Sequence, residues 1–436
     1  MKRRSAPRSP LAVALVALAL VGASGIACGK KKGDGSTTSP AGSASAPVAS
    51  APAAPTPSAP PATQVASAPV GDGVGAFVAA GQTEACKAQT GEVAAYLQRG
   101  EVTVAGREGA IAASWLIKMS ATKPGAQLAF AGFDLDAKQV ARARGIGSSN
   151  EMTPRLFASG TGWTLVWFDA EGLAFTRPRW ETQPAPVIEH LRAISGAAVD
   201  DVALDATPAG SLVAVAPFTV DKTQLGLFLF APSDATAPPV QALGATHHAK
   251  APKRPAVAAD AGGYTLAWQE EDGRLAVSRF DLTGKELADE PITLAAAGPT
   301  REHLVLTRTE KGAIAVWSEG DRILGRAMDA SAKPADTTYV IGKGRSHALA
   351  PLGEGAIVTF LGQDGATPDQ VLAVRLGADG APSAKGLRVN DVGPVKDAPA
   401  VAAAGARTAF LWTEPMAGGV ATKRAILRAV DSACVP

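Results

Sequence analysis

The stretch PAVAADAGGYTLAWQEEDGRLAVSRFDLTGKELADEPITLA, residues 255–295, reads as four short strands separated by tight turns. Apolar and polar residues alternate within the runs, and the glycine-containing steps GG, DG and TG fall between them. Residues 303–342 and 347–390 repeat the same order of strands and turns. The repeating unit predicted by this pattern is a small antiparallel sheet of four strands.

The second strand of this unit recurs along most of the chain. A small residue opens most copies, and an aromatic often closes them. The copies are GAIAASWL (109–116), GWTLVWFD (162–169), GSLVAVAPF (210–218), GYTLAWQE (263–270), GAIAVWSE (312–319), GAIVTFLG (355–362) and RTAFLWTE (407–414). Four short strands in a repeat of roughly 40–50 residues are typical of a β-propeller blade. The sequence therefore predicts an all-β fold, a seven-bladed β-propeller of four-stranded blades.

The predicted propeller spans residues 80–436. Its blades are expected at about 101–150, 151–198, 199–248, 249–298, 299–344, 345–393 and 394–436. The last copy has no room for a fourth strand, and EVAAYLQRG (92–100) is predicted to supply it from the N-terminal side. Six or eight blades, a tandem of β-sandwiches and a β-solenoid are the alternatives.

The aromatics near the end of the second strand form a series of their own. Its members are Trp115, Trp167, Trp268, Trp317 and Trp412, with Phe360 in one copy. One large aromatic per blade is expected to pack between blades, burying roughly 150–250 Å² each. The alternative is a ring of aromatics that stack on a ligand.

The N-terminus has the pattern of an export signal. Basic residues precede Leu11–Gly22, a run of twelve apolar residues, whereas a membrane-spanning helix needs roughly 20. Small residues then lead to Cys28. This end resembles the lipobox of bacterial lipoprotein signals, although Gly25 stands where that family usually has leucine. The resemblance implies a signal peptide over 1–27 and a lipid on Cys28; ordinary signal cleavage is the alternative.

Residues 28–79 are rich in Pro, Ala and Ser and are predicted to form a disordered tether. A lipid at one end would make the membrane a partner of the protein. By the same resemblance, Gly29 after the cysteine implies an outer-membrane lipoprotein in the cell envelope, facing the periplasm or the surface.

Two cysteines remain once Cys28 is assigned to a lipid. Cys86 lies at the start of the folded part, and Cys434 is the third residue from its end. Export places this pair in an oxidising compartment, and a closed ring brings the two ends together. A disulfide between Cys86 and Cys434 is therefore predicted, with two free thiols as the alternative.

The folded part has no basic stripe. The whole chain has 42 basic and 40 acidic residues, and four of the basic residues belong to the signal. Nucleic acid is therefore not an expected partner. No catalytic, cofactor-binding or metal-ligating motif stands out, and the one histidine pair, His247-His248, reads as a solvated loop rather than as metal ligands. No catalytic, cofactor or metal residues are predicted, and the expected state is a monomer.

These observations favour a non-enzymatic binding or scaffold module with a protein or glycan partner. The loops that differ most between repeats are the expected contact sites; they are residues 120–127, 231–239 and 362–370. The alternative is a secreted hydrolase or lyase with its site at the mouth of the channel. The fold alone does not decide between these two functions.

Overall fold

The computed structural model describes residues 68–81, 86–97, 100–118, 126–149, 154–159, 162–169, 172–178, 188–191, 202–207, 210–217, 224–230, 241–246, 252–391, 393–416 and 422–436. The predicted signal peptide, Cys28 and residues 29–67 lie outside this part of the chain. The pair His247-His248, loop 231–239 and most of loop 120–127 lie outside it as well.

The described strands form five four-stranded sheets and one eight-stranded sheet. Among the four-stranded sheets, three follow the chain as β3 (Val102–Arg107), β4 (Ala110–Lys118), β5 (Ala126–Phe133), β6 (Gln139–Ser149); β7 (Arg155–Ser159), β8 (Gly162–Asp169), β9 (Gly172–Thr176), β10 (Glu189–Leu191); and β11 (Ala203–Ala206), β12 (Leu212–Pro217), β13 (Leu225–Phe230), β14 (Gln241–Ala245). The other two are β15 (Lys253–Asp260), β16 (Gly263–Gln269), β17 (Leu275–Phe280), β18 (Ile292–Ala295); and β26 (Ala400–Ala404), β27 (Arg407–Pro415), β28 (Lys423–Asp431), β2 (Gln89–Leu97).

The eight-stranded sheet joins two such groups through one long strand. Its members are β19 (Arg301–Thr309), β20 (Gly312–Glu319), β21 (Arg322–Asp329), β22 (Tyr339–Leu352), β23 (Gly355–Asp364), β24 (Thr367–Leu376), β25 (Gly386–Arg388) and β1 (Phe77–Ala79). The first part of β22 pairs with β21 and its second part, from Gly344, pairs with β23. The boundary predicted between residues 344 and 345 therefore falls inside a continuous strand.

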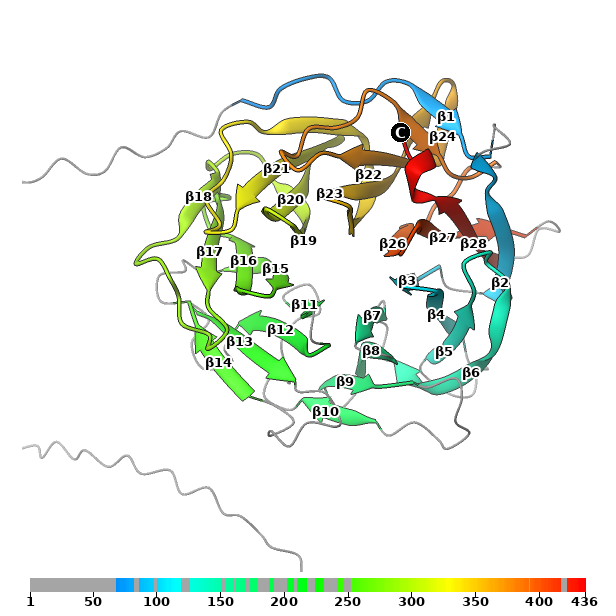
Figure 1. Cartoon of the computed structure of the whole chain (residues 1–436), viewed down its shortest axis with the longest axis horizontal. Coiled ribbons are helices and arrows are strands. Elements are labelled where there is room, and N and C mark those ends of the chain that lie inside the picture. Colours follow the sequence, from blue (N-terminus) through cyan, green and yellow to red (C-terminus); the bar gives the residue numbers. More distant parts are fainter. Residues whose placement is uncertain are drawn as a thin grey trace, which may run out of the picture. The chain divides into compact units, whose positions relative to one another are not determined.

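The innermost strands contact one another in a closed cycle. β3 contacts β7, and the series continues through β11, β15, β19, β22 and β26 back to β3. Figure 1 shows these strands around a central axis, with the later strands of each group further out. This is the arrangement of a β-propeller and not of tandem sandwiches or a solenoid, and each group of four strands is a blade. No α-helix occurs among the described residues, and the chain ends in a short 3-10 turn, η4 (Ser432–Cys434).

The second strand of each blade is apolar because neighbouring blades cover both of its faces. In β16 and β20, every residue but the last is buried. Each begins with a glycine at positive φ, Gly263 at 145° and Gly312 at 148°. A Cβ on Gly263 would lie 2.0 Å from the carbonyl oxygen of Phe280, so a side chain does not fit there. This crowding explains the small residue that opens the sequence repeat.

The recurring aromatics are packing elements, as the first of the two interpretations predicted. Their side chains are among the largest that are fully buried: Trp115, Trp167, Trp268, Trp317, Phe360 and Trp412. None is available to stack on a ligand, so the alternative interpretation is wrong.

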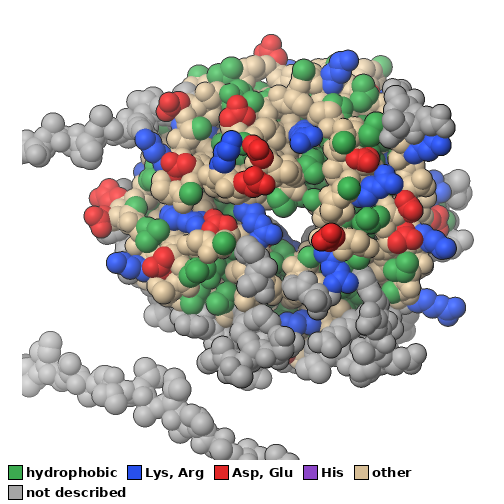
Figure 2. Space-filling view, viewed as in Figure 1, with side chains coloured by type: hydrophobic (Ala, Val, Ile, Leu, Met, Phe, Trp, Pro, Cys, Tyr) green, Lys and Arg blue, Asp and Glu red, His purple; other side chains and the backbone are tan. Residues whose placement is uncertain are grey.

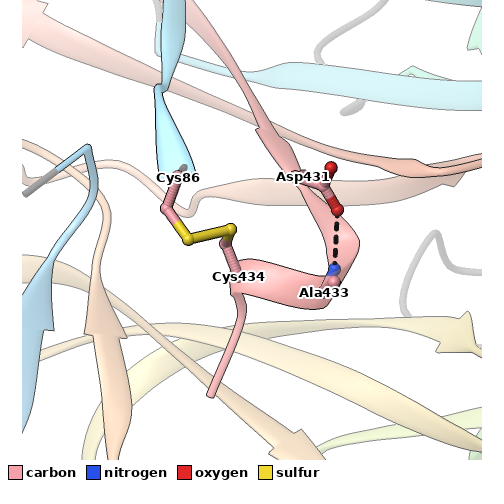
Figure 3. Close-up of a disulfide and its surroundings, with 4 residues drawn as sticks. All are labelled: Cys86, Asp431, Ala433 and Cys434. Atoms are coloured by element: carbon pink, nitrogen blue, oxygen red, sulfur yellow. Dashed lines mark hydrogen bonds between the residues drawn. A yellow bond between two sulfur atoms is a disulfide. The ribbon is translucent and has the colours of Figure 1, made fainter. Parts of the chain in front are cut away.

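The ring is closed between the two ends of the folded chain. β2 pairs antiparallel with β28 and completes that blade; the sequence placed this strand at residues 92–100, whereas it runs from Gln89 to Leu97. Cys86, ahead of β2, is bonded to Cys434, with their Cα atoms 5.6 Å apart (Figure 3). The Asp431 carboxylate accepts a hydrogen bond from the Ala433 amide, at 2.9 Å, and so caps the turn that presents Cys434.

The end of the predicted tether is part of the fold, so its boundary at residue 79 is wrong. β1 pairs in parallel with β25, and Val70 forms an isolated parallel bridge with Tyr339. Residues 68–81 therefore follow the outer edges of two blades. The sequence predicted a tether here because this segment is glycine-rich and too short to show the alternating pattern of a strand.

Loss of the Cys86–Cys434 bond should lower the melting temperature without removing the strands. The loop spans 348 residues, for which the chain-entropy relation gives roughly 6 kcal/mol at most. Thermal melts followed by far-UV circular dichroism, with and without reductant, measure this. The double variant C86S/C434S is the control, since reductant should not affect it further. An unchanged melting temperature, or loss of the strand spectrum at 25 °C, would contradict the prediction.

Candidate functional site

The two ends of the channel differ in the connections that surround them. The loop face carries the connections between blades and the links from second to third strands, such as residues 270–274 and 296–300. The hairpin face carries the links from first to second and from third to fourth strands, such as residues 309–312 and 329–334. Propeller ligands usually meet loops at the mouth of the channel, so both mouths were candidates for the site.

Three consecutive innermost strands carry the same β-bulge at the loop face. In β15, β19 and β22, two residues oppose one residue of the second strand. The first of the two is a non-glycine residue at positive φ: Arg254 at 49°, His303 at 52° and Ser346 at 55°. Bulges are enriched beside active sites because they re-aim side chains, and left-handed non-glycine residues gather at functional sites. This row marks the loop-face mouth as the candidate site.

A buried histidine lies at the centre of this row. His347, the second residue of its bulge, is 7% exposed, and its Nδ1 lies 3.2 Å from the Ser318 hydroxyl. The His303 and His347 rings meet edge to face with centroids 6.0 Å apart. Burial, followed by the neighbouring His303, lowers the pKa of His347 to about 4, and the carbonyls of His303 and Val316 offset this only in part. His347 is therefore neutral at neutral pH.

Acidic residues of the loop face are held by arginine and tryptophan. Trp317 donates to Glu319 at 3.2 Å and Trp412 to Glu414 at 2.9 Å. The carboxylates also bind Arg301 and Arg424, respectively. Arg301 further donates to the carbonyls of Gly273 and Ala296 in the preceding connections. These charges fix the loops and are not gathered around one reacting point.

The β16 blade has the same Trp-x-Glu pair, but its tryptophan does not donate to its glutamate. Glu270 is held by Arg274 at 2.5 Å through one oxygen. Its other oxygen and the Trp268 indole nitrogen are buried without a hydrogen bond. The spacing Trp-x-Glu was visible in the sequence at residues 268–270, 317–319 and 412–414. It is the signal that would have identified these carboxylates in advance.

A second polar cluster lies near the hairpin face. Asp205 accepts hydrogen bonds from its neighbour Ala206 and, across the seam between two blades, from the Ala259 amide at 2.7 Å. Arg308 of a third blade donates to the carbonyls of Ala206 and Ala259 at 3.3 and 3.4 Å. Burial raises the pKa of Asp205 to about 6, while these amides and Arg308 act in the opposite direction. The cluster ties three innermost strands together.

The predicted site residues have different outcomes. Cys86 and Cys434 are bonded as expected, and Cys28 lies outside the described residues. Of the variable loops, residues 362–370 are described; there Asp369 binds Arg345 at 2.8 Å. Figure 2 shows acidic and basic side chains interspersed on the visible face, which is hollowed near its centre.

The described residues contain neither a metal-binding cluster nor a membrane-spanning helix. No group of three or more His, Cys, Asp or Glu side chains there is placed to hold a metal ion. No helix in the same part of the chain is long and apolar enough to cross a membrane.

Comparisons with known proteins give similarity in fold only. No protein-family model and no curated protein matches the chain. Among solved structures, it is similar to the WD40 domain of SCAP from fission yeast, at 10% identity and a TM-score of 0.41 over 79% of this chain and 98% of that one. It is also similar to the WD40 domain of Toxoplasma gondii coronin, at 11% and 0.44 over 84% and 89%. Trypanosoma rangeli sialidase matches at 9% and 0.38 over 76% and 55%. These scores are low, so the fold is assigned from the sheets and contacts themselves.

Asp205 should make stability fall as the pH rises. Its pKa is about 6 in the folded protein against 3.8 ordinarily, so the folded state holds the proton more tightly. Stability is then lost between about pH 4 and 6, by at most about 3 kcal/mol. Asp205→Asn should abolish this slope, whatever constant cost it adds, when melting temperatures are measured from pH 4 to 7.

Asp260→Asn is the matched control. The carboxylate of Asp260 is bound by Arg279, and although burial acts to raise its pKa, the bonds from Arg279 and from backbone amides leave it lowered. Its contribution is therefore present at neutral pH and lost on acidification, opposite in sign to that of Asp205. An Asp205→Asn profile parallel to that of the wild type would contradict the assignment.

Proposed function

We propose that this chain is a membrane-anchored lipoprotein whose seven-bladed propeller is a non-enzymatic binding or scaffold module for a protein or glycan partner in the cell envelope. The Cys86–Cys434 bond carries the proposal. Disulfides form and persist in oxidising compartments, so this bond supports export of the protein. Because the bond uses Cys86 and Cys434, Cys28 is the one remaining cysteine, and it follows the apolar run where a lipid would be attached. Gly29 supports sorting to the outer membrane.

The blade count in this proposal is seven. It is supported by the seven copies of the second strand in the sequence, and by the long β22, which serves as the outer strand of one blade and the inner strand of the next.

A binding role is favoured over catalysis by how the carboxylates are used. Glu319 and Glu414 are bound by arginine and tryptophan, and Asp205 by backbone amides. Convergent free carboxylates would be the mark of a propeller hydrolase. These three carboxylates are instead distributed between the two faces, where each fixes a loop or a seam.

The second candidate function is a hydrolase or lyase at the channel mouth, and one observation favours it. The buried His347 is neutral and lies within hydrogen-bond distance of the Ser318 hydroxyl, so it could accept that proton. Ser318→Ala discriminates between the functions: an enzyme would lose its activity, whereas a binding module would keep its partner.

Partner binding should depend on the loop face. Exposed charges there, Glu302 and Arg345, can be reversed as Glu302→Lys and Arg345→Glu, and exposed charges of the hairpin face, Lys311→Glu and Lys333→Glu, serve as the matched control. We expect pull-downs of the lipoprotein from its own membranes to lose the partner with the first pair only. Loss with the second pair alone would place binding on the opposite face.

Membrane anchoring should depend on Cys28. Cys28→Ser should move the protein from the membrane pellet to the soluble fraction, because it removes the atom that would carry the lipid. Cell fractionation with immunoblotting measures this, and Cys86→Ser/Cys434→Ser is the control that removes cysteines but should not release the protein. Retention of Cys28→Ser in the pellet would contradict the anchor.

A further inference from the structure

The segment 70–80 is built into the outer edges of the β20 and β23 blades as a strap. Val70 receives a hydrogen bond from the Val340 amide, at 3.0 Å, and gives one to the Thr338 carbonyl, at 2.7 Å. The Ala76 carbonyl accepts from Gly386 and the Ala80 amide donates to Arg388, both at 2.9 Å. Figure 1 shows the strap along the rim, outside β22 and beside β24.

The strap is also anchored by its side chains in slots lined by glycine. Phe77 meets Phe360 edge to face at 6.5 Å, and a Cβ on Gly386 would lie 2.4 Å from the Phe77 ring. Val74 and Phe77 join the apolar cluster between the β20 and β23 blades. Further along, Val78 and Ala80 join the cluster between the β23 and β27 blades. The strap therefore covers two seams.

Each of the three neighbouring seams between the β16, β20, β23 and β27 blades contains a buried backbone carbonyl that accepts a hydrogen bond from outside its own sheet. Leu294 and Ile341 are each the extra residue of a β-bulge in the fourth strand of their blade, so the ladder does not pair them. A buried carbonyl without a donor destabilises the fold. At the seam after the β16 blade, Arg326 Nη1 donates to the Leu294 carbonyl at 2.6 Å. At the seam after the β23 blade, Arg428 donates in the same way to the Val389 carbonyl.

The intervening seam lacks this arginine. Isolated bridges Met328–Pro334 and Leu376–Pro382 align the third strands, and so place Val374 where the neighbouring blade has Arg326. Val374 is fully buried and has no donor. The Ile341 carbonyl is instead bound by the Val74 amide of the strap, at 3.0 Å. A backbone group from the N-terminal segment thus stands where the two neighbouring seams use a guanidinium.

We propose that residues 70–80 form a detachable latch for the seam between the β20 and β23 blades, in place of the arginine that holds the neighbouring seams. The segment comes before the ring in the chain, so tension on the N-terminus reaches the latch first. Detachment can proceed from Val70 to Cys86 and stops there, because the disulfide fixes Cys86 to the last blade. The direction of load in the cell rests on the proposed anchor; the latch itself does not.

Exchange of the latch for an arginine tests this directly. Val374→Arg places a guanidinium at the Ile341 carbonyl and should expel the strap. We expect residues 70–80 to become protease-sensitive and to exchange amide hydrogens at least tenfold faster, while the melting temperature stays near that of the wild type. Arg326→Val is the matched control: no strap covers its seam, so it should lower the melting temperature by several degrees. A Val374→Arg protein that keeps its strap and loses as much stability as Arg326→Val would overturn the proposal.

A second variant covers the case in which Val374→Arg does not fold. Val74→Pro removes the amide that binds Ile341 and leaves the seam without a donor. We expect faster hydrogen exchange in the strap and in the first part of β22, but not in β17 or β18. Unchanged exchange at both places would overturn the latch. Neither measurement involves the lipid, so failure of the anchor and failure of the latch are distinguishable.

Single-molecule pulling between the two termini tests the stop at Cys86. In the oxidised protein, a first event should release residues 70–85, a length of roughly 55 Å at most. With reductant, the same event should continue into β2 and open the ring. An oxidised protein that extends without a first event of this length, or identical traces with and without reductant, would overturn the proposal.

Discussion

A four-stranded blade cannot cover its own faces, so the whole structure depends on closing the ring. The second strands show this most clearly: β16 and β20 are buried along nearly their whole length, which is possible only with a neighbour on each side. An open ring would expose the faces of its two end blades. Two devices close it, namely the pairing of β2 with β28 and the Cys86–Cys434 bond. The strap adds a third contact of the N-terminal segment, at the outer edges of the β20 and β23 blades.

Closing the ring also buries backbone carbonyls at the seams, and each of these needs a hydrogen-bond donor. Bulges in the fourth strands leave the carbonyls of Leu294 and Ile341 outside the ladder. The arginine Arg326 and the Val74 amide meet the same requirement by different chemistry. A side chain on the blade belongs permanently to its seam, whereas a donor on a separate segment can leave. The seams are therefore similar in burial but not in how they can open.

Much of this architecture could be predicted from the sequence. The repeat GYTLAWQE and its copies gave the strands, because a doubly covered strand is continuously apolar, and the crowding at Gly263 shows why the opening residue is small. The two cysteines gave the closure. The strap could not be predicted, because Val74 and Phe77 find their partners in slots made by glycines of distant strands. Nor could the continuous β22, since Lys343-Gly344-Arg345 has the composition of a turn.

The candidate site was hidden for a related reason. A bulge adds a single residue, which hydrophobic periodicity does not register, yet it turns Arg254, His303 and Ser346 into left-handed conformations. Such residues cost roughly 1–3 kcal/mol each and persist only where the surroundings hold them. The seams joining these three blades are the ones held by Arg326 and by the strap. The strained loop-face row and the strap therefore belong to one arc of the ring, formed by the β16, β20 and β23 blades.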